Sequence, residues 1–295
     1  MYKLIDSAFS FEKSGSPLCT YSDLLTTSCI MLKKLYHALL GMLLLAPVSG
    51  FAWGVTGHRV VAEIASHHLS PQARKAITAL LGRQSMAMVA NWPDFIKSDT
   101  THKYDRTSPW HYLDFPANCT RAQFDEVIKA HATGDNLYAQ TEALIKQLKD
   151  PATSKEDKVF ALSFLIHMIG DMHQPLHAGR DEDQGGNKIQ VMWFDKQTNL
   201  HRVWDEHLIE FQQLSYTEYT NALDTATAAT VKKIQGGTVA DWIFESNQLS
   251  GKVYSLTHAN DKLNYRYNFW FVNDLNNQLL KGGLRLAAVL NQIYK

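Results

Sequence analysis

Histidine and aspartate recur in this sequence at spacings that suit metal binding. The chain has 13 histidines, and a neutral imidazole is the commonest side-chain metal ligand. In FLIHMIGDMHQPLHAG, His167 and Asp171 are four residues apart in an apolar helix, so both lie on one face. Pro175 then ends the helix and brings His177 around, whereas His173 is rotated away and is expected behind the ligands or in solvent. Burying such a pair without partners would be costly, so this segment predicts a metal site.

A second His and Asp pair follows at the same spacing. In LHRVWDEHLI, His201 and Asp205 are four residues apart, the carboxylate precedes an amphipathic helix, and His207 faces another way. One such pair is compatible with a surface interaction on the order of a few tenths of a kcal/mol. Two pairs, with further histidines and aspartates before them, indicate a site with several metal ions.

Earlier segments carry further candidate ligands. WGVTGHR contains His58 and Trp53, and Trp53 has a free α-amino group if the chain is cleaved before it. An α-amino group has a pKa of about 7.7 to 8, so a metal ion can displace its proton. NWPDFIK supplies Asp94 and Lys97, and SPWHYLDFP supplies His111. Taken singly, these residues are more typical of helix caps, packing and solvated loops.

The candidate ligands together fit three zinc ions. Zinc takes about four ligands, and a catalytic site leaves one position open for water. Nine residues with nitrogen or oxygen donors, one carboxylate bridging, suffice: Trp53, His58, Asp94, His111, His167, Asp171, His177, His201 and Asp205. Zinc sites built from thiolates are excluded, because Cys119 is the one cysteine outside the predicted leader.

These residues are expected on a mainly α fold, a single-domain helical bundle with long metal-binding loops. Apolar residues recur at helical spacing after Trp204 and in four earlier segments: 60–64, 124–128, 144–148 and 160–166. Alternating strand patterns are scarce, and Lys188 to Phe194 is the best candidate. Two long irregular connections, 83–119 and 172–203, are rich in Gly, Pro, Asp, Asn and His, and loops this long are usually functional.

The first 52 residues are interpreted as separate from this domain. Residues 31–52, MLKKLYHALLGMLLLAPVSGFA, combine two lysines, an apolar run and small residues ending at Ala52, the pattern of a secretory signal peptide. The run is too short for a membrane span, which needs about 20 residues. Residues 1–30 are an over-long start or an N-terminal extension. The predicted mature domain is therefore 53–295, periplasmic or secreted, without stable membrane association.

Composition narrows the function further. The 29 basic and 29 acidic residues balance, which disfavours a protein that collects nucleic acid by overall positive charge. With 45% apolar residues the chain can bury a sizeable core. Because Cys119 stands alone in the mature chain, no intramolecular disulfide is possible, and something else must stabilise an exported protein.

The motifs, taken in order, resemble those of the S1/P1 nuclease family. WGxxGH, NWPDxIK, WHYLDFP, HxxGDxHQPLH, GGN and HxxWDxxL follow one another between Trp53 and Lys295. Members of this family are secreted, mostly helical enzymes with three zinc ions. The resemblance implies a first zinc held by Asp94, His111, His167 and Asp171, a second by His177, His201 and Asp205, and a third by Trp53, His58 and the bridging Asp171.

The resemblance also implies an activity. The family hydrolyses phosphodiester bonds of single-stranded DNA and RNA to 5′-phosphate products and removes 3′-phosphates from nucleotides. By the same resemblance Tyr112 stacks a nucleobase, Asp114 and Asn187 bind its edge, and Lys97 steadies phosphate charge. Each residue also has an ordinary structural reading: Tyr112 in the core, Asp114 in a turn, Asn187 in a tight loop, and Lys97 as a solvated charge. No obligate protein partner is inferred, and a monomer is expected.

A metal-bound hydroxide is the expected nucleophile, with catalytic roles for Asp171 and Lys97. Zinc can lower the pKa of a bound water to about 7, and the chain has no GxSxG motif to supply a serine. Zinc-dependent phospholipase C resembles the same fold and metal set and is the alternative enzyme, although Tyr112, Asp114 and Asn187 favour a nucleobase. A non-enzymatic periplasmic zinc-binding protein is the third reading, but it would favour a flexible His-rich tract instead of dispersed ligands.

Overall fold

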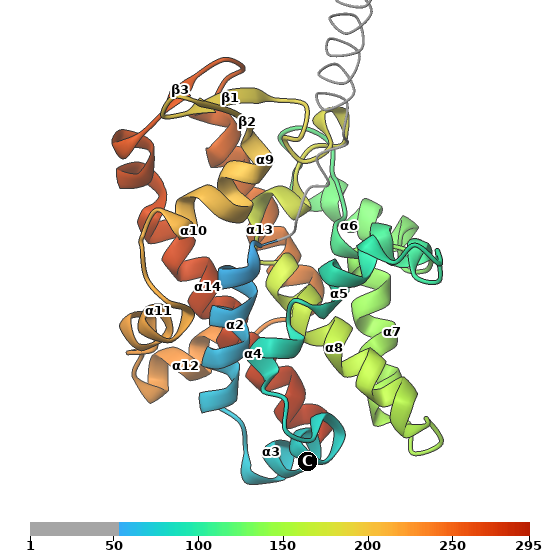
Figure 1. Ribbon diagram of the computed structural model, residues 1–295. Helices are drawn as coiled ribbons and strands as arrows, with labels where there is room; N and C mark the ends of the chain where they lie inside the picture. The colour runs from blue at the N-terminus through green and yellow to red at the C-terminus, as the bar shows by residue number, and fades with distance from the viewer. Residues whose placement is uncertain (1–52) are drawn as a thin grey trace, which may run out of the picture. The chain divides into compact units, whose positions relative to one another are not determined.

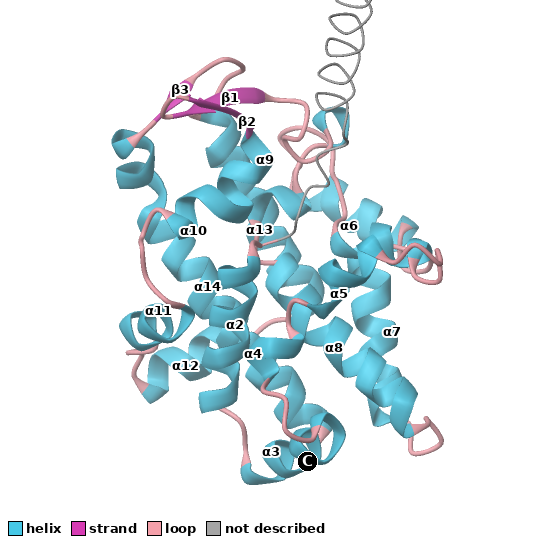
Figure 2. Ribbon diagram, viewed as in Figure 1, coloured by secondary structure: helices cyan, strands magenta, loops and turns pink. Residues whose placement is uncertain are grey.

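The fold is mainly α, as the sequence predicted. The computed structural model describes residues 53–295, and the predicted signal peptide and residues 1–30 lie outside the described residues. Helices make up most of this part of the chain, and strands are confined to one small sheet (Figure 2). No helix within 53–295 is both long and apolar enough to cross a membrane.

Within residues 53–295, nine α-helices are seven residues or longer. They are α2 (Val55–His67), α3 (Pro71–Leu81), α6 (Arg121–Ala130), α7 (Leu137–Lys149), α8 (Lys155–Asp171), α11 (Tyr216–Leu223), α12 (Ala228–Ile234), α13 (Val239–Ser255) and α14 (Tyr265–Ile293). All of them except α12 contribute buried residues to the core. Polar caps fix several of their starts. The Ser154 hydroxyl accepts from the N–H of Asp157 at the start of α8, and Thr238 and Asp241 form a capping box at the start of α13.

The two connections predicted to be irregular contain short helices and a hairpin. Residues 83–119 include α4 (Met86–Val89), α5 (Trp92–Phe95), η1 (Ile96–Ser98) and η2 (Asp105–His111). Residues 172–203 include η3 (Pro175–Ala178), η4 (Asp181–Asp183), β1 (Gln190–Trp193) and β2 (Lys196–Asn199). These pieces are too short to show a periodic pattern in the sequence, which explains why they were missed.

Helix α8 lies at the centre of the fold. Every residue from Ala161 to Asp171 is buried, because α2, α5, α7 and α14 all pack against this helix. Figure 1 shows α8 between α7 on one side and α4 and α2 on the other. The C-terminal turns of α8 therefore deliver His167 and Asp171 into the protein interior.

Helices α2 and α14 approach closely because α14 has glycines at the contact. A Cβ atom added to Gly283 would lie 2.5 Å from Cβ of Ile64, and one added to Gly282 would lie 3.2 Å from Cγ2 of Val61. Real side chains do not tolerate the first of these distances. Since α2 also carries His58, this contact helps to set the position of that ring relative to α8.

A three-stranded sheet with the order β2-β1-β3 lies at one end of the described part of the chain (Figure 1). Strand β1 pairs antiparallel with β2 and parallel with β3 (Lys262–Leu263). The strand predicted at Lys188 to Phe194 is thus confirmed as β1 within those bounds, and the two short partner strands were not foreseen.

The hairpin leads into one continuous helical segment. It consists of α9 (Leu200–Arg202), the π-helical η5 (Val203–His207) and α10 (Leu208–Glu210). The prediction that Asp205 precedes a helix is wrong, because Asp205 lies inside this segment. The π-helical turn occurs at a group of candidate ligands, as such turns frequently do at functional sites.

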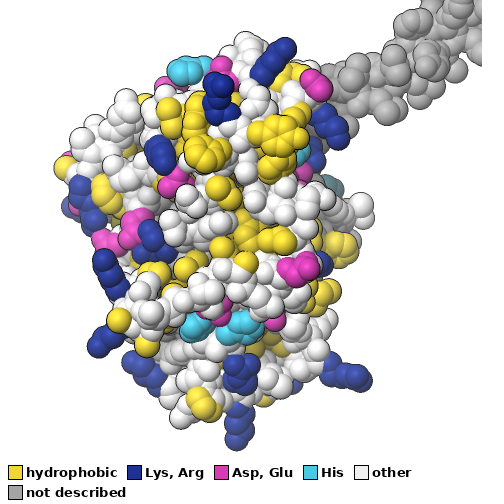
Figure 3. Space-filling model, turned by 90° about the vertical axis from the view of Figure 1, so that its left-hand side faces the viewer, with side chains coloured by type: hydrophobic (Ala, Val, Ile, Leu, Met, Phe, Trp, Pro, Cys, Tyr) yellow, Lys and Arg dark blue, Asp and Glu magenta, His cyan; other side chains and the backbone are white. Residues whose placement is uncertain are grey.

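Charged side chains are dispersed on the face drawn in Figure 3. Lysines and arginines are scattered there among acidic and apolar side chains, without one continuous basic patch. This distribution agrees with the balanced charge of the sequence.

Candidate metal centre

Buried histidines and aspartates form three groups, and within each group the candidate ligand atoms lie within 4.8 Å of one another. The groups are Asp94, His111 and His167; His177, His201 and Asp205; and His58, His167 and Asp171. Eight of the nine predicted metal ligands therefore converge, although they come from five separate stretches of the chain. Their arrangement is compatible with metal binding, as the sequence predicted.

Asp171 connects the three groups. Its Oδ2 lies 2.9 Å from Nδ1 of His111 and 3.2 Å from Nε2 of His167. Its Oδ1 lies 3.4 Å from Nε2 of His58 and 3.5 Å from Nδ1 of His177. Burial alone would raise the pKa of Asp171, but the surrounding imidazoles, His167 foremost, hold that pKa well below its usual value. These contacts favour the charged form of the carboxylate, which lies between the three groups.

Asp94 completes the first group from the short helix α5. Its Oδ1 lies 3.6 Å from Nε2 of His167 and 3.8 Å from Nδ1 of His111. Lys97 follows one turn later, and its Nζ donates a hydrogen bond of 2.7 Å to the same oxygen. Burial alone would raise the pKa of Asp94, but His167 and Lys97 lower it overall. Lys97 is therefore held against the candidate ligand Asp94. The alternative prediction, a freely solvated surface charge, is wrong.

Backbone carbonyls orient three of the histidine rings. Each ring places Nδ1 against a carbonyl oxygen: His167 against Ala90 at 2.7 Å, His177 against His111 at 2.7 Å, and His201 against Gly185 at 2.6 Å. A carbonyl oxygen can only accept, so each Nδ1 carries a proton, and in the neutral ring the lone pair is then on Nε2. Metal-binding histidines almost always have such a partner on the other nitrogen.

Several buried polar atoms in these groups have no hydrogen-bond partner within the described residues. They are both ring nitrogens of His58, Nε2 of His111 and of His177, Oδ1 of Asp171, and Oδ2 of Asp205. Unpaired buried polar atoms are costly and rare in proteins. Bound cations would satisfy most of them, so the residues present fit a metal centre.

The N-terminal end of the described chain is anchored beside this centre. Trp53 is fully buried, and its indole N–H donates to the carbonyl oxygen of Gly170 at 2.6 Å. A Cβ atom on Gly170 would lie 2.8 Å from Nδ1 of His58, so glycine is needed for the ring of His58 to fit. That ring stacks on His167 with centroids 3.7 Å apart and 16° between the planes.

The second group has a supporting residue that the sequence analysis missed. Asp205 lies 3.2 Å from His201 Nε2 and 3.5 Å from His177 Nε2. Buried Gln174 donates from Nε2 to Oδ1 of Asp205 at 2.6 Å, and its own Oε1 accepts from the N–H of Leu176. Burial alone would raise the pKa of Asp205, but His201 and His177 lower it to about 2. The position of Gln174 inside HQPLH was the available indication.

Tyr112 and Asp114 line one cavity of about 700 Å³ next to the second group. Tyr112 is 46% exposed, so the reading that places it in the core is wrong. Between them, the N–H of Leu113 donates to the carbonyl oxygen of His177 at 2.9 Å, which fixes this segment beside that ligand. Burial raises the pKa of Asp114 to about 7, and its buried Oδ1 has no hydrogen-bond partner among residues 53–295.

Asn187 is not among the residues that line this cavity. Its Nδ2 donates to the carbonyl oxygen of Gln184 at 2.9 Å within the Gly-Gly-Asn loop. Asp183 holds the same loop, because its Oδ1 accepts from the N–H of Gly186 at 2.6 Å and from the hydroxyl of Tyr254 at 2.9 Å. The loop reaches the second group through the carbonyl oxygen of Gly185, which accepts from Nδ1 of His201.

Two further histidines of these motifs lie outside the groups. His173 is fully buried, with Nδ1 against the carbonyl of Ile169 and Nε2 facing Arg285 at 3.0 Å. The sequence placed His173 either behind the ligands or in solvent, and its burial shows that the second prediction is wrong. His207 stacks on the ring of Trp193 and faces away from the ligands, as predicted.

Comparison with known proteins agrees with this arrangement. The family model S1/P1 Nuclease matches residues 53–295. The chain belongs to the S1/P1 nuclease family. It is 32% identical over 276 residues to Endonuclease 4 of Arabidopsis thaliana, covering 82% of this chain and 89% of that protein. It is 30% identical over 274 residues to Nuclease P1 of Penicillium citrinum, covering 82% and 98%. This S1/P1-type chain is a nuclease, a hydrolase of phosphodiester bonds, and the expected enzyme class is confirmed.

Proposed function

We propose that this enzyme is a zinc-dependent endonuclease of single-stranded DNA and RNA. It leaves 5′-phosphate ends and also removes the 3′-phosphate of nucleotides. The observation that carries this proposal is the joining of three buried His and Asp groups through one carboxylate, Asp171. An arrangement of this kind suits several cations acting on one phosphate.

The donor set suits three zinc ions. Asp94, His111, His167 and Asp171 would hold one, His177, His201 and Asp205 a second, and Trp53, His58 and Asp171 a third. Imidazole nitrogens and carboxylate oxygens are usual zinc ligands. Bound zinc would supply Lewis-acid chemistry and lower the pKa of a water to about 7.

The chain's own residues position the substrate. Lys97 lies against Asp94 with its ammonium 2.7 Å from Oδ1, where it can balance negative charge that develops on a phosphate. The half-exposed ring of Tyr112 is available for stacking a base, a contact that tolerates any sequence. Asp114, in the same cavity, and Asn187 are proposed to hydrogen-bond the base edge. Because stacking needs an unpaired base, single strands are the preferred substrates.

We further propose that the active chain is the domain 53–295, exported as a monomer after cleavage behind Ala52. Trp53 is buried, and its indole N–H donates a hydrogen bond to the carbonyl oxygen of Gly170, one residue before Asp171. Cleavage would give Trp53 a free amine in place of a peptide nitrogen at this point. Comparing the zinc content of chains that begin at Trp53 and at Met31 tests this. The chain from Met31 is expected to bind less zinc and lose activity, and equal zinc and activity would reject the idea.

The central experiment measures the release of acid-soluble nucleotide from single-stranded DNA and RNA by the zinc-loaded chain 53–295. Phosphatidylcholine and a nucleoside 3′-monophosphate serve as parallel substrates. We expect nucleotide and phosphate release that chelation abolishes and zinc restores. Asp171→Asn is expected to lose activity, while the control Asp274→Asn, which removes a surface ion pair with Lys252, keeps it. Turnover of the lipid alone would overturn the proposal in favour of phospholipase C activity.

A further inference from the structure

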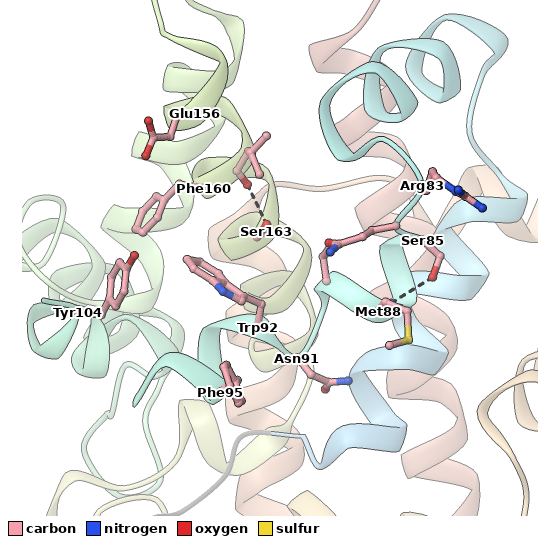
Figure 4. Close-up of a pocket in the computed structure, with 13 residues that line it drawn as sticks. Arg83, Ser85, Met88, Asn91, Trp92, Phe95, Tyr104, Glu156, Phe160 and Ser163 are labelled. Carbon is pink, nitrogen blue, oxygen red and sulfur yellow. Dashed lines mark hydrogen bonds between the residues drawn. The ribbon is translucent and has the colours of Figure 1, made fainter. Parts of the chain in front are cut away.

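A second large cavity lies beside the first group of candidate ligands. Its volume is about 810 Å³, within the range of roughly 300–1,000 Å³ typical of ligand pockets. Figure 4 shows Trp92 in its middle, Tyr104 and Phe160 on one side, and Met88 on the opposite side. The cavity is distinct from the one lined by Tyr112, with which it shares no lining residue.

Four of the thirteen residues that line this cavity are aromatic. The ring of Trp92 meets those of Tyr104 and Phe160 edge to face, with centroids 5.7 and 5.8 Å away. Phe95 also lines the cavity and is 77% exposed, although a phenylalanine in a folded protein is usually buried. Trp92, Tyr104 and Phe160 are partly buried, so Phe95 offers the exposed ring face, and nucleobases stack on such faces irrespective of sequence.

The short helix α5 joins this cavity to the metal centre. Asp94 points inward to the histidines and is buried, whereas its neighbour Phe95 faces outward. On α8, Ser163 lines the cavity four residues before His167, which is about 6 Å along the helix. The cavity therefore begins within about one nucleotide of the first group.

The two cavities lie toward different groups of candidate ligands. Leu113, between Tyr112 and Asp114, donates a backbone hydrogen bond to the carbonyl oxygen of His177, a member of the second group. The cavity with Trp92 adjoins Asp94, a member of the first group. A polynucleotide with a phosphate at the centre must continue in both directions, and the two cavities share no lining residue, so each is available to a different neighbouring base.

The second cavity has little net charge, so stacking is the main interaction that it offers to a nucleic acid. Arg83 and Glu156 are its charged lining residues and carry opposite signs. Lys97, at the junction with the metal centre, is the positive charge closest to Asp94 among the described residues. A strand of nucleic acid would thus meet a cation where its phosphate lies and aromatic rings where its next base lies.

We propose that the cavity around Trp92 and Phe95 binds a base on the 3′ side of the scissile phosphate in a single-stranded substrate. The inference rests on the proposed function. Hydrolysis to a 5′-phosphate makes the 3′ oxygen the leaving group, and we assign that oxygen to the nucleoside whose base stacks on Tyr112. The nucleotide that keeps the 5′-phosphate then extends past Asp94 toward Phe95.

The test compares Phe95→Ala with Phe269→Ala, a matched control on α14 that is 78% exposed. Substrates are a nucleoside 3′-monophosphate, which ends at the phosphate, and a single-stranded oligothymidylate long enough to occupy both cavities. Phe95→Ala is expected to lower the ratio of kcat/KM for the oligonucleotide to that for the mononucleotide by about 5- to 150-fold. Phe269→Ala should leave the ratio unchanged. Met88→Ala, on the opposite wall, should lower it in the same direction.

Unchanged ratios in both cavity variants would overturn this inference while leaving the proposed function intact. If the wild-type enzyme turned over neither the mononucleotide nor the oligonucleotide, the proposed function itself would be overturned.

A second measurement locates the base directly. A phosphorothioate oligonucleotide with one photoreactive base is crosslinked to the zinc-loaded enzyme, and the adducts are mapped by mass spectrometry. A base on the 3′ side of the bound phosphate is expected to attach within residues 83–104, and one on the 5′ side near Tyr112. Adducts of the 3′ base confined to other parts of the chain would reject the assignment.

Discussion

At the scale of single residues, the centre depends on side chains that orient the candidate ligands as much as on the ligands themselves. Gln174 is the clearest case, because it is fully buried and uses both ends of its amide. The donor end holds one oxygen of Asp205, and the acceptor end holds the backbone turn that carries His177. Such supporting contacts commonly set metal affinity.

Replacing Gln174 with alanine is expected to weaken zinc binding at the second group by about 10- to 100-fold. Without this hydrogen bond the carboxylate of Asp205 would lose its fixed orientation. Part of the free energy of zinc binding would then be spent on ordering that side chain. Zinc affinity is measured by competition with a chelator of known strength. Gln278→Ala is the control, since Gln278 is also buried but bonds to the His173 carbonyl and to Ser246. Equal affinities in the two variants would contradict this role of Gln174.

At the scale of elements, close helix contacts hold the candidate ligands in register. Helix α8 carries His167 and Asp171, α2 carries His58, and α14 supports both helices. A buried network continues this support away from the metal centre. Arg285 of α14 contacts His173 through Nη1 and the carboxylate of Glu245 on α13 through Nη2.

Gly283→Ala is expected to destabilise the fold by about 1–3 kcal/mol, the usual cost of overpacking. The added methyl would meet Cβ of Ile64 at 2.5 Å and push α2 away. Gly251→Ala on α13 is the matched control, because a Cβ atom there has nothing within 4 Å. That variant should be neutral or gain up to about 1 kcal/mol from helix propensity. Urea unfolding of both variants checks the prediction, and a loss of equal size in both would contradict it.

Glu245→Gln is expected to lower stability near neutral pH and to matter less in acid. Burial alone would raise the pKa of Glu245, but hydrogen bonds from Lys281 and Arg285 lower it overall. A carboxylate with a depressed pKa adds stability that is complete above its unfolded pKa and is lost as pH falls through the folded pKa. The difference between wild type and variant should therefore be full above about pH 5 and shrink below about pH 4.5. Unfolding measured across this range tests it, and a constant difference would refute the link to this ionisation.

At the scale of the whole molecule, the candidate metal centre joins parts of the chain that are distant in sequence. The groups draw on α2, on the connection 83–119, on α8, on η3 and on the helical segment after the hairpin. Cys119 is the one cysteine in the described residues and is free. Ions held there would therefore act as crosslinks that the chain cannot supply through disulfides within residues 53–295.

Removal of zinc is expected to lower the melting temperature as well as abolish activity. A ligand that binds only the folded state adds stability, about 2.7 kcal/mol per site at a free concentration 100 times its Kd. Scanning calorimetry with and without chelator, followed by zinc addition, measures this. A melting curve that does not move after demonstrated zinc removal would show that the ions have no structural part.

The sequence by itself determined the helical class of the fold and most of the candidate ligands. A spacing of four residues places His167 beside Asp171 and His201 beside Asp205 through local helix geometry, which neighbouring residues specify. The proline after the first pair brings His177 back for the same local reason. The strand pattern at Lys188 to Phe194 was likewise readable from residues next to one another.

Only the tertiary structure decided which side chains meet across the chain. It placed Gln174 on Asp205, the indole of Trp53 on Gly170, and His173 against Arg285, contacts between residues 31, 117 and 112 positions apart. It also left Asn187 outside the Tyr112 cavity and created a second cavity beside Phe95. Such contacts depend on how helices pack against one another, and packing is set jointly by many side chains that no local spacing reports.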